Sequence, residues 1–191
     1  MKLVLGLTGP NGAGKGEVCK YLKSKGFVVT SLSDILREIA NKKCIPPTRN
    51  NLVTLGNKLR KQYGGGILAK LLIKNVLKKI GQGKIVIDSI RTVGEITTLK
   101  EVFGDSFFLI HITAPKKIRF KFILNRSREG DPKTYKEFIE IERKECSSRT
   151  VQQQIHKCKQ LSDFIINNNS TLKALYGKID KVLDKINHKF Y

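Results

Sequence analysis

The chain has 191 residues, of which 37 are Lys or Arg and 16 are Asp or Glu, so its formal net charge is +21. Hydrophobic residues make up 40% of the sequence, which excludes a disordered basic tail, because such a tail lacks the apolar material for a core. No apolar run approaches the roughly 20 residues of a membrane-spanning helix, and no cleavage site follows the first residues, so we expect a soluble, cytoplasmic protein.

Short apolar runs alternate with helical patterns along the first 80 residues. The opening apolar run predicts a strand, and the glycine loop after it leads into a helix. A second strand follows, and Ser33 at the start of the next apolar pattern favours a helix that its hydroxyl caps. The predicted segments are strands over 2–8 and 27–31, a helix over 14–25, a helix from Ser33 to Pro46, and helices over 51–63 and 67–80.

Three further strands and a closing helix are predicted in the remainder. Residues 107–112 are continuously apolar, as expected of a parallel strand that is buried on both faces. The other segments are strands over 84–88 and 164–166 and a helix over 171–186. Strands that alternate with helices imply right-handed crossovers, so we expect a single α/β domain over 1–191, with a five-stranded parallel sheet flanked by helices. The charged stretch over 116–155 predicts a helical excursion across one end of this sheet.

The most specific motif lies between the first strand and the first helix. A strand, the pattern GxxxxGK and a helix follow one another in the arrangement of a P-loop. Glycines let successive backbone N–H groups surround phosphate oxygens, the helix N-terminus adds partial positive charge, and Lys15 reaches the β- and γ-phosphates. The residues assigned to nucleotide binding are Gly9, Pro10, Asn11, Gly12, Ala13, Gly14, Lys15, Gly16 and Glu17.

The expected metal site departs from the usual P-loop pattern. Gly16, followed by Glu17, stands where most P-loop enzymes place the hydroxyl that binds Mg²⁺, so this ligand is absent. Asp88 ends the third predicted strand, beside the P-loop, and is the acid expected to hold Mg²⁺ directly or through water.

Two arginines follow the second and third strands, at the edge where open α/β sheets bind ligands. Arg37 and Arg91 each offer a planar fork for a phosphate, and Asp34 orients Arg37 or favours the helix dipole. In the charged excursion we assign Arg119 and Arg126 to a lid that neutralises transferring phosphates and excludes water. Further arginines of this stretch are Arg128, Arg143 and Arg149.

These motifs resemble those of adenylate kinases and related nucleoside monophosphate kinases, in which glycine follows the P-loop lysine and threonine comes next. Residues 33–37 are similar to the segment whose arginine grips the acceptor phosphate in those enzymes. Residues 88–91 are similar to their Asp-Gly-Phe-Pro-Arg segment, with the arginine one position earlier. The resemblance covers nearly the whole chain and extends to adenylate-kinase-related nucleotide kinases found chiefly in archaea, while residues 162–172 are also similar to dephospho-coenzyme A kinases.

The resemblance implies a P-loop NTPase fold with a donor site for ATP and Mg²⁺, an acceptor region over 33–80 and a lid over 116–155. It implies a kinase that moves the γ-phosphoryl of ATP to a (deoxy)nucleoside monophosphate, with Arg37 and Arg91 on the acceptor. A dephospho-coenzyme A kinase is one alternative. A nucleic-acid-associated P-loop ATPase is another, since clustered cations release counterions from a phosphate backbone, although the positive charge is spread over the whole chain. The base, the sugar and the oligomeric state are left open.

Overall fold

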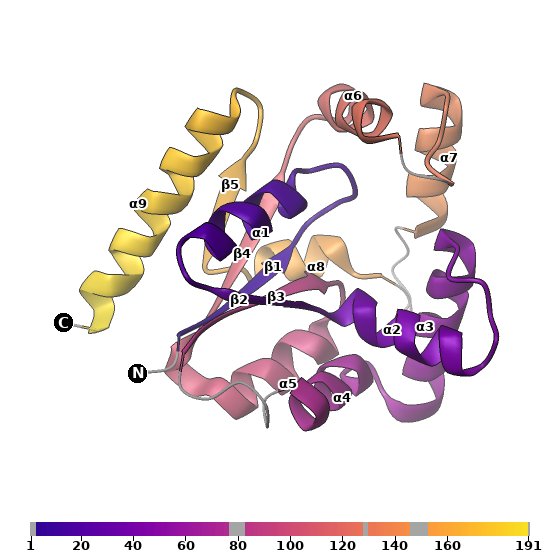
Figure 1. Cartoon of the computed structure of the whole chain (residues 1–191), viewed down its shortest axis with the longest axis horizontal. Helices are drawn as coiled ribbons and strands as arrows, with labels where there is room; N and C mark the ends of the chain where they lie inside the picture. The colour runs from indigo at the N-terminus through magenta and orange to yellow at the C-terminus, as the bar shows by residue number, and fades with distance from the viewer. Residues whose placement is uncertain (1–2, 77–82, 128–129, 146–152, 191) are drawn as a thin grey trace.

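The computed structural model describes residues 3–76, 83–127, 130–145 and 153–190 (Figure 1). Within them, five strands form one parallel sheet in the order β2-β3-β1-β4-β5. The strands are β1 (Leu3–Thr8), β2 (Val28–Ser31), β3 (Lys84–Ile90), β4 (Phe107–Thr113) and β5 (Phe164–Asn167). The predicted fold class, a five-stranded parallel sheet flanked by helices, is confirmed.

Helices cover both faces of the sheet. They are α1 (Lys15–Ser24), α2 (Leu32–Lys42), α3 (Arg49–Tyr63), α4 (Ile67–Val76), α5 (Val93–Phe103), α6 (Lys116–Arg126), α7 (Tyr135–Glu145), α8 (Ile155–Gln160) and α9 (Leu172–Phe190). A short 3-10 turn, Gly104–Ser106, joins α5 to β4. Among the described helices, none combines the length and the hydropathy needed to cross a bilayer.

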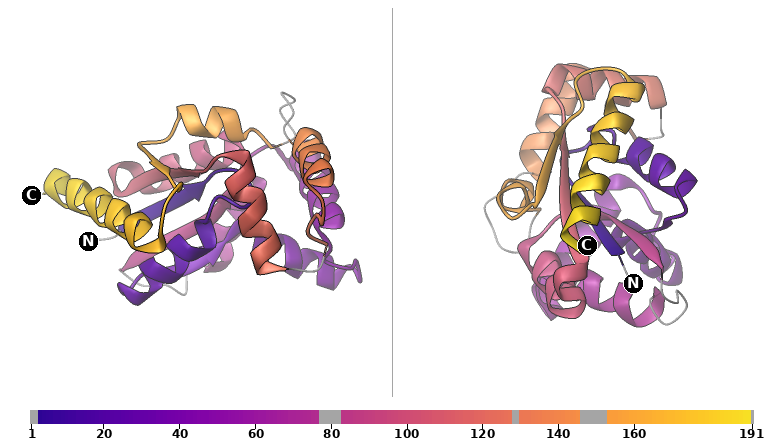
Figure 2. Two further views of the ribbon diagram at one scale, coloured as in Figure 1. Left: turned by 90° about the horizontal axis from the view of Figure 1, so that it is seen from above. Right: turned by 90° about the vertical axis from the view of Figure 1, so that its left-hand side faces the viewer.

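Two apolar cores result from the alternation of side chains along the strands. Leu3, Leu5 and Leu7 of β1 pack with α1 and α9 on one face. Val4 belongs to the core on the other face, to which α2, α3, α4, α5 and α8 contribute apolar side chains. Figure 2 shows these layers on either side of the sheet. Because both faces are covered, the central strands read as continuous apolar runs, as parallel strands do.

The topology gathers the carboxyl ends of β1 and β3 at one edge. From β1 the chain passes through α1 to β2 at one side of the sheet, and from β3 it passes through α5 to β4 on the other side of β1. Connections that leave neighbouring strands in opposite directions open a crevice beyond their carboxyl ends. Residues 9–14 and 88–92 therefore meet at this crevice.

Two boundaries differ from the prediction. Helix α2 begins at Leu32 and is capped by Ser31, whose hydroxyl accepts the Ser33 N–H at 3.2 Å, so the predicted cap at Ser33 is wrong. The helix starts earlier because Leu32 already belongs to its buried face. Strand β3 continues to Ile90, so Asp88 lies within the strand and not at its end.

Helix α5 was not predicted. Its β-branched residues, among them Val93, Ile96 and Thr98, are poor helix formers and dilute the helical pattern. The overlooked signal is a capping box, in which Thr92 accepts the Glu95 N–H and Glu95 accepts the Thr92 N–H.

The charged stretch over 116–155 contains α6 and α7, and α8 begins at its end. Arg128 and Arg149 lie outside the described residues. The division of the chain into an acceptor region and a lid stays a prediction.

A close glycine contact gives a stability test. A Cβ at Gly94 would lie 2.6 Å from the carbonyl carbon of Gly65, so the first turn of α5 and the connection between α3 and α4 approach too closely there for any side chain. Gly94→Ala should lower the free energy of unfolding by about 1–3 kcal/mol. Gly177→Ala in α9, where a Cβ meets nothing within 4 Å, is the matched control and should raise it by roughly 0.5–1 kcal/mol. Denaturant titration measures both, and equal effects of the two variants would contradict the close packing.

Candidate active site

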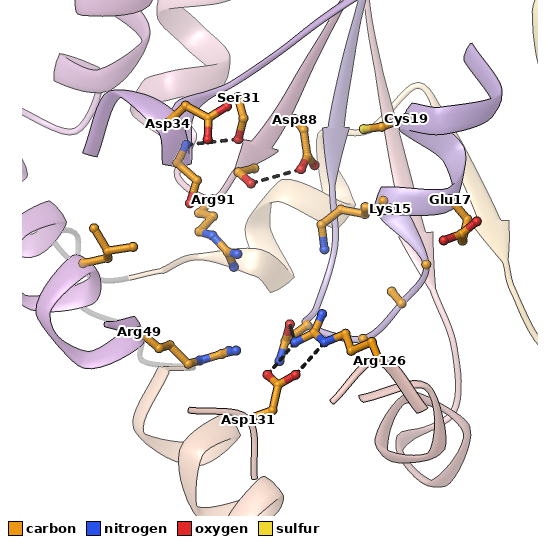
Figure 3. Close-up of a pocket in the computed structure, with 18 of the residues that line it drawn as sticks. Lys15, Glu17, Cys19, Ser31, Asp34, Arg49, Asp88, Arg91, Arg126 and Asp131 are labelled. Carbon is orange, nitrogen blue, oxygen red and sulfur yellow. Dashed lines mark hydrogen bonds and ion pairs between the residues drawn. The ribbon is translucent and has the colours of Figure 1, made fainter. Parts of the chain in front are cut away.

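A cavity of about 900 Å³ lies at the carboxyl ends of β1 and β3. Its volume is within the range of small-molecule sites. Walls come from the P-loop and α1, from α2 and α3, from the end of β3, and from the α6–α7 connection. Figure 3 shows Lys15, Arg49, Arg91 and Arg126 pointing into this space from different elements.

The backbone of the P-loop is fixed by a residue from the far end of the chain. Asn168 follows β5, is buried, and donates from Nδ2 to the Ala13 carbonyl at 3.0 Å. Gly14 stands in the left-handed region with φ of 97°, and a side chain there would collide with the Asn168 amide. Only glycine therefore fits this turn into α1. Sequence reasoning missed the role of Asn168, because no local pattern marks it.

Lys15 lies folded along its own loop. Its Nζ donates to the carbonyls of Gly9 and Pro10, both at 2.8 Å. Burial, the largest cause, and the Arg91 guanidinium lower the pKa of the Lys15 ammonium, while the Asp88 carboxylate opposes both, and the pKa lies at about 7. A positive charge held at this cost is stabilised by any anion that approaches it.

Gly16 and Glu17 leave the start of α1 without a hydroxyl. Glu17 is ion-paired with Lys20 at 2.8 Å and lies in the first helical turn, where a carboxylate favours the helix dipole. A Cβ at Gly16 would meet nothing within 4 Å, so packing does not require glycine at this position.

Asp88 is placed to meet a cation. Its Oδ2 accepts the Ser89 hydroxyl at 3.2 Å, while its Oδ1 is buried with no hydrogen-bond partner in the described chain. No cluster of three or more His, Cys, Asp or Glu residues suited to a metal ion occurs in the described ranges. A single carboxylate fits Mg²⁺, which is commonly bound by one or two carboxylates together with substrate phosphates and water.

The predicted acceptor residues line the same cavity. Arg37 donates from Nη1 to Asp34 Oδ1 at 2.8 Å, and both side chains are exposed. Arg91 donates from Nη1 to Gln153 Oε1 at 2.9 Å and points toward Lys15 (Figure 3). Lys15, Asp88, Arg37 and Arg91 are thus brought together, with Asp34 beside Arg37.

The two lid arginines lie in different surroundings. Arg119 is buried and is not among the described residues that line the cavity. It donates to the backbone carbonyls of Ala114 at 3.0 Å and Asn11 at 3.1 Å, and to Glu142 of α7. These contacts hold the backbone of the P-loop at Asn11. The catalytic role predicted for Arg119 stays a prediction.

Arg126 lies on the cavity side. Its guanidinium makes a bidentate ion pair with Asp131, from Nε to Oδ2 and from Nη2 to Oδ1, both at 2.7 Å. Nη2 also donates to Asn11 Oδ1 at 3.3 Å. Asn11 therefore receives one lid arginine on its backbone carbonyl and the other on its side chain. Arg143 is exposed on α7.

Two further arginines line the cavity without having been given a role from the sequence. Arg49 opens α3 and points into the cavity (Figure 3). Arg60 lies about three turns later in α3 and is almost fully buried. The helical spacing of α3 marks its apolar face but does not identify a buried cation on it.

Comparison with known proteins gives matches over nearly the full length. A family model described as AAA domain matches residues 8–140. A UPF0200 protein of Pyrococcus horikoshii is 34% identical over 188 residues, which cover 96% of this chain and 97% of that protein. A UPF0200 protein of Saccharolobus islandicus is 31% identical over 186 residues, covering 97% of this chain and 94% of that protein.

Solved structures agree in fold. A protein of Thermus thermophilus superposes with a TM-score of 0.64 at 19% identity, with 96% of this chain and 97% of that chain covered. A shikimate kinase from Bacteroides thetaiotaomicron gives a TM-score of 0.58 at 10% identity, with 95% and 98% covered. A sugar kinase from Janibacter gives 0.55 at 13% identity, with 96% and 95% covered. The fold is that of P-loop kinases.

The depressed pKa of Lys15 predicts a pH-dependent stability. Between about pH 7 and 10.5 the unfolded chain holds a proton on Lys15 that the folded chain lacks, so this group makes stability rise with pH across that window. Lys15→Met removes the burial of the charge. Its thermal midpoint relative to the wild-type protein should therefore increase as pH falls from 10 to 7.

Thermal melts without nucleotide between pH 6 and 10 measure this difference. Lys20→Met, at an exposed lysine of the same helix, is the control. A difference between Lys15→Met and wild type that does not vary with pH would show that Lys15 is not held with a lowered pKa.

Proposed function

The chain belongs to the UPF0200 family and has the fold of a P-loop kinase, and we propose that it transfers the γ-phosphoryl group of ATP to the phosphate of a nucleoside monophosphate. One observation carries the proposal. Lys15, Asp88, Arg37 and Arg91 line a single cavity at the carboxyl edge of the sheet, which gives room for a donor and a phosphorylated acceptor side by side.

The donor half uses the P-loop. Backbone N–H groups of residues 11–14 and the N-terminus of α1 bind the phosphates, and Lys15 exchanges its loop carbonyls for their oxygens. Asp88 Oδ1, which has no hydrogen-bond partner among the described residues, would hold Mg²⁺, and the ion would neutralise phosphate charge. Anionic phosphate oxygens favour the protonated form of Lys15, so they oppose the lowering of its pKa by burial.

The acceptor half uses arginines. Arg37 and Arg91 hold the acceptor phosphate so that one of its oxygens faces the γ-phosphorus of ATP. A new P–O bond forms there while the bond to the β–γ bridging oxygen breaks, and ADP leaves with that electron pair. Such a transfer requires in-line positioning and charge neutralisation more than a strong base.

The lid arginines divide the remaining work. Before substrates bind, Arg126 is ion-paired with Asp131 and hydrogen-bonded to Asn11. On closure it leaves these partners and contacts the transferring phosphates. Arg119 keeps α6, α7 and the P-loop in register and acts as a positioning residue. In this proposal residues 33–80 form the acceptor region and residues 116–155 the lid.

The proposed reaction is tested with labelled ATP, Mg²⁺ and a panel of ribo- and deoxyribonucleoside monophosphates, with dephospho-coenzyme A included. We expect transfer to at least one nucleoside monophosphate. Lys15→Ala should lower the rate by roughly 10²–10³, the usual effect of removing one donor that stabilises the charge of a transition state. Lys23→Ala, at an exposed lysine of the same helix that is not among the cavity-lining residues, is the control and should keep the rate.

Other outcomes of this panel decide against the proposal. Phosphorylation of dephospho-coenzyme A alone would point to a hydroxyl acceptor. ATP hydrolysis without transfer, together with tight RNA or DNA binding at ~150 mM salt, would point to the nucleic-acid alternative.

Substitution of individual arginines separates the two halves of the cavity. Arg91→Ala should weaken binding of the acceptor by about 1.5–3 kcal/mol, the worth of a charged hydrogen bond, and leave ATP affinity nearly unchanged. Arg37→Ala should weaken acceptor binding in the same direction but by less, because Arg37 is exposed and ion-paired with Asp34.

Arg126→Ala should lower kcat more than it raises the KM for ATP or for the acceptor, because its phosphate contacts are completed only on closure. Steady-state kinetics with calorimetry would refute the assignment if all three variants changed only ATP affinity.

A further inference from the structure

An ion pair lies buried behind the acceptor half of the cavity. Arg60 of α3 and Glu95 of α5 have side chains that are 3% and 0% exposed. Arg60 donates to Glu95 Oε1 from Nη2 at 2.9 Å and from Nε at 3.3 Å. The attraction within a buried pair scarcely repays its loss of hydration, so stability alone does not explain why two charges replace apolar side chains here.

The second oxygen of Glu95 fixes the backbone that carries Arg91. Oε2 accepts the N–H of Arg91 at 2.8 Å and the N–H of Thr92 at 3.1 Å. Thr92 in turn donates from its hydroxyl to the Gly65 carbonyl at 3.0 Å, between α3 and α4. The Glu95 carboxylate thus binds both the guanidinium of Arg60 and the backbone N–H of Arg91.

Arg60 itself borders the cavity. It lines the cavity together with Leu52 and Val53, which precede it on α3, and with Arg91, which follows β3. Its Nε and Nη2 are used on Glu95, so Nη1, which lies beside Gly56, remains for a further acceptor. Arg60, Arg91 and Glu95 together carry one net positive charge.

We propose that Arg60 contacts the anionic group of the acceptor, and that Glu95 is a positioning residue that sets Arg60 and Arg91 as a pair of donors around it. The group that fits is a doubly charged phosphate monoester, because its oxygens can accept from both guanidinium groups at once. This inference rests on the proposed function and extends it, since it identifies the charge state of the acceptor group and a buried residue, Arg60, that recognises this group.

The test removes the charges without leaving either one unpaired. In the double variant Arg60→Met with Glu95→Gln the pair becomes neutral at similar volume, and the Gln oxygen still accepts the N–H groups of Arg91 and Thr92. We expect a thermal midpoint at or above that of the wild-type protein, a KM for the nucleoside monophosphate raised at least tenfold, and an unchanged KM for ATP. Wild-type acceptor KM in this folded variant would overturn the contact by Arg60.

A second double variant isolates the positioning role. Arg60→Met with Glu95→Met also removes the acceptor for the N–H of Arg91, so acceptor KM should rise at least threefold beyond that of the Gln variant. Equal KM values in the two double variants would overturn the role of Glu95 in placing Arg91.

A small displacement of Arg60 gives an independent check. A Cβ at Gly56 would lie 3.2 Å from Arg60 Nη1, so Gly56→Ala should shift this guanidinium and raise acceptor KM severalfold. Gly177→Ala is the control for alanine in a helix and should leave acceptor KM unchanged. Equal acceptor KM in the two variants would count against the contact.

Binding of inorganic phosphate separates this inference from the proposed function. The titration uses protein whose P-loop is filled with Mg²⁺ and a non-hydrolysable ATP analogue. Phosphate binding to wild type, with at least tenfold weaker binding to the Gln double variant, would support the site even if no nucleoside monophosphate were phosphorylated. Equal phosphate affinity in the two proteins, or no phosphate binding to wild type, would overturn the inference.

Discussion

The shape of the loop between β1 and α1 is imposed from outside the loop, and the rest of the site depends on it. Asn168 donates to the Ala13 carbonyl from one side, and Arg119 donates to the Asn11 carbonyl from another. These contacts join the loop to the end of β5 and to the start of α6. Because backbone carbonyls are held in this way, the N–H groups of the loop keep the direction that phosphate binding requires.

Buried or half-buried charge is the second constraint that runs through the site. Lys15, Asp88, Arg60 and Glu95 are all taken out of bulk water to some degree, which costs free energy that folding alone does not return. Three of these groups border the cavity. A molecule that tolerates such charges stores part of the free energy with which it then binds an ion of opposite sign.

Local sequence determined the parts of the fold that depend on local physics. The strand, glycine loop and helix over residues 3–24 follow from apolar periodicity and backbone freedom, and Asp88 and Arg91 reach the cavity because parallel strands end at one edge. The pair of Arg60 and Glu95 joins residues 35 positions apart, and Asn168 meets Ala13 across 155 positions. Neither contact leaves a periodic trace, and only the packing of the helices on the sheet brings these residues together.

The direction of the sheet also divides the molecule into an edge that carries chemistry and an edge that only connects. Residues 25–27 and 104–106 lie at the amino edge, and none of them borders the cavity. Strand β1 starts and α9 ends on that same side (Figure 1). Insertions, affinity tags or a rearranged chain order are therefore best placed in these connections, where chain engineering leaves the geometry of the cavity intact.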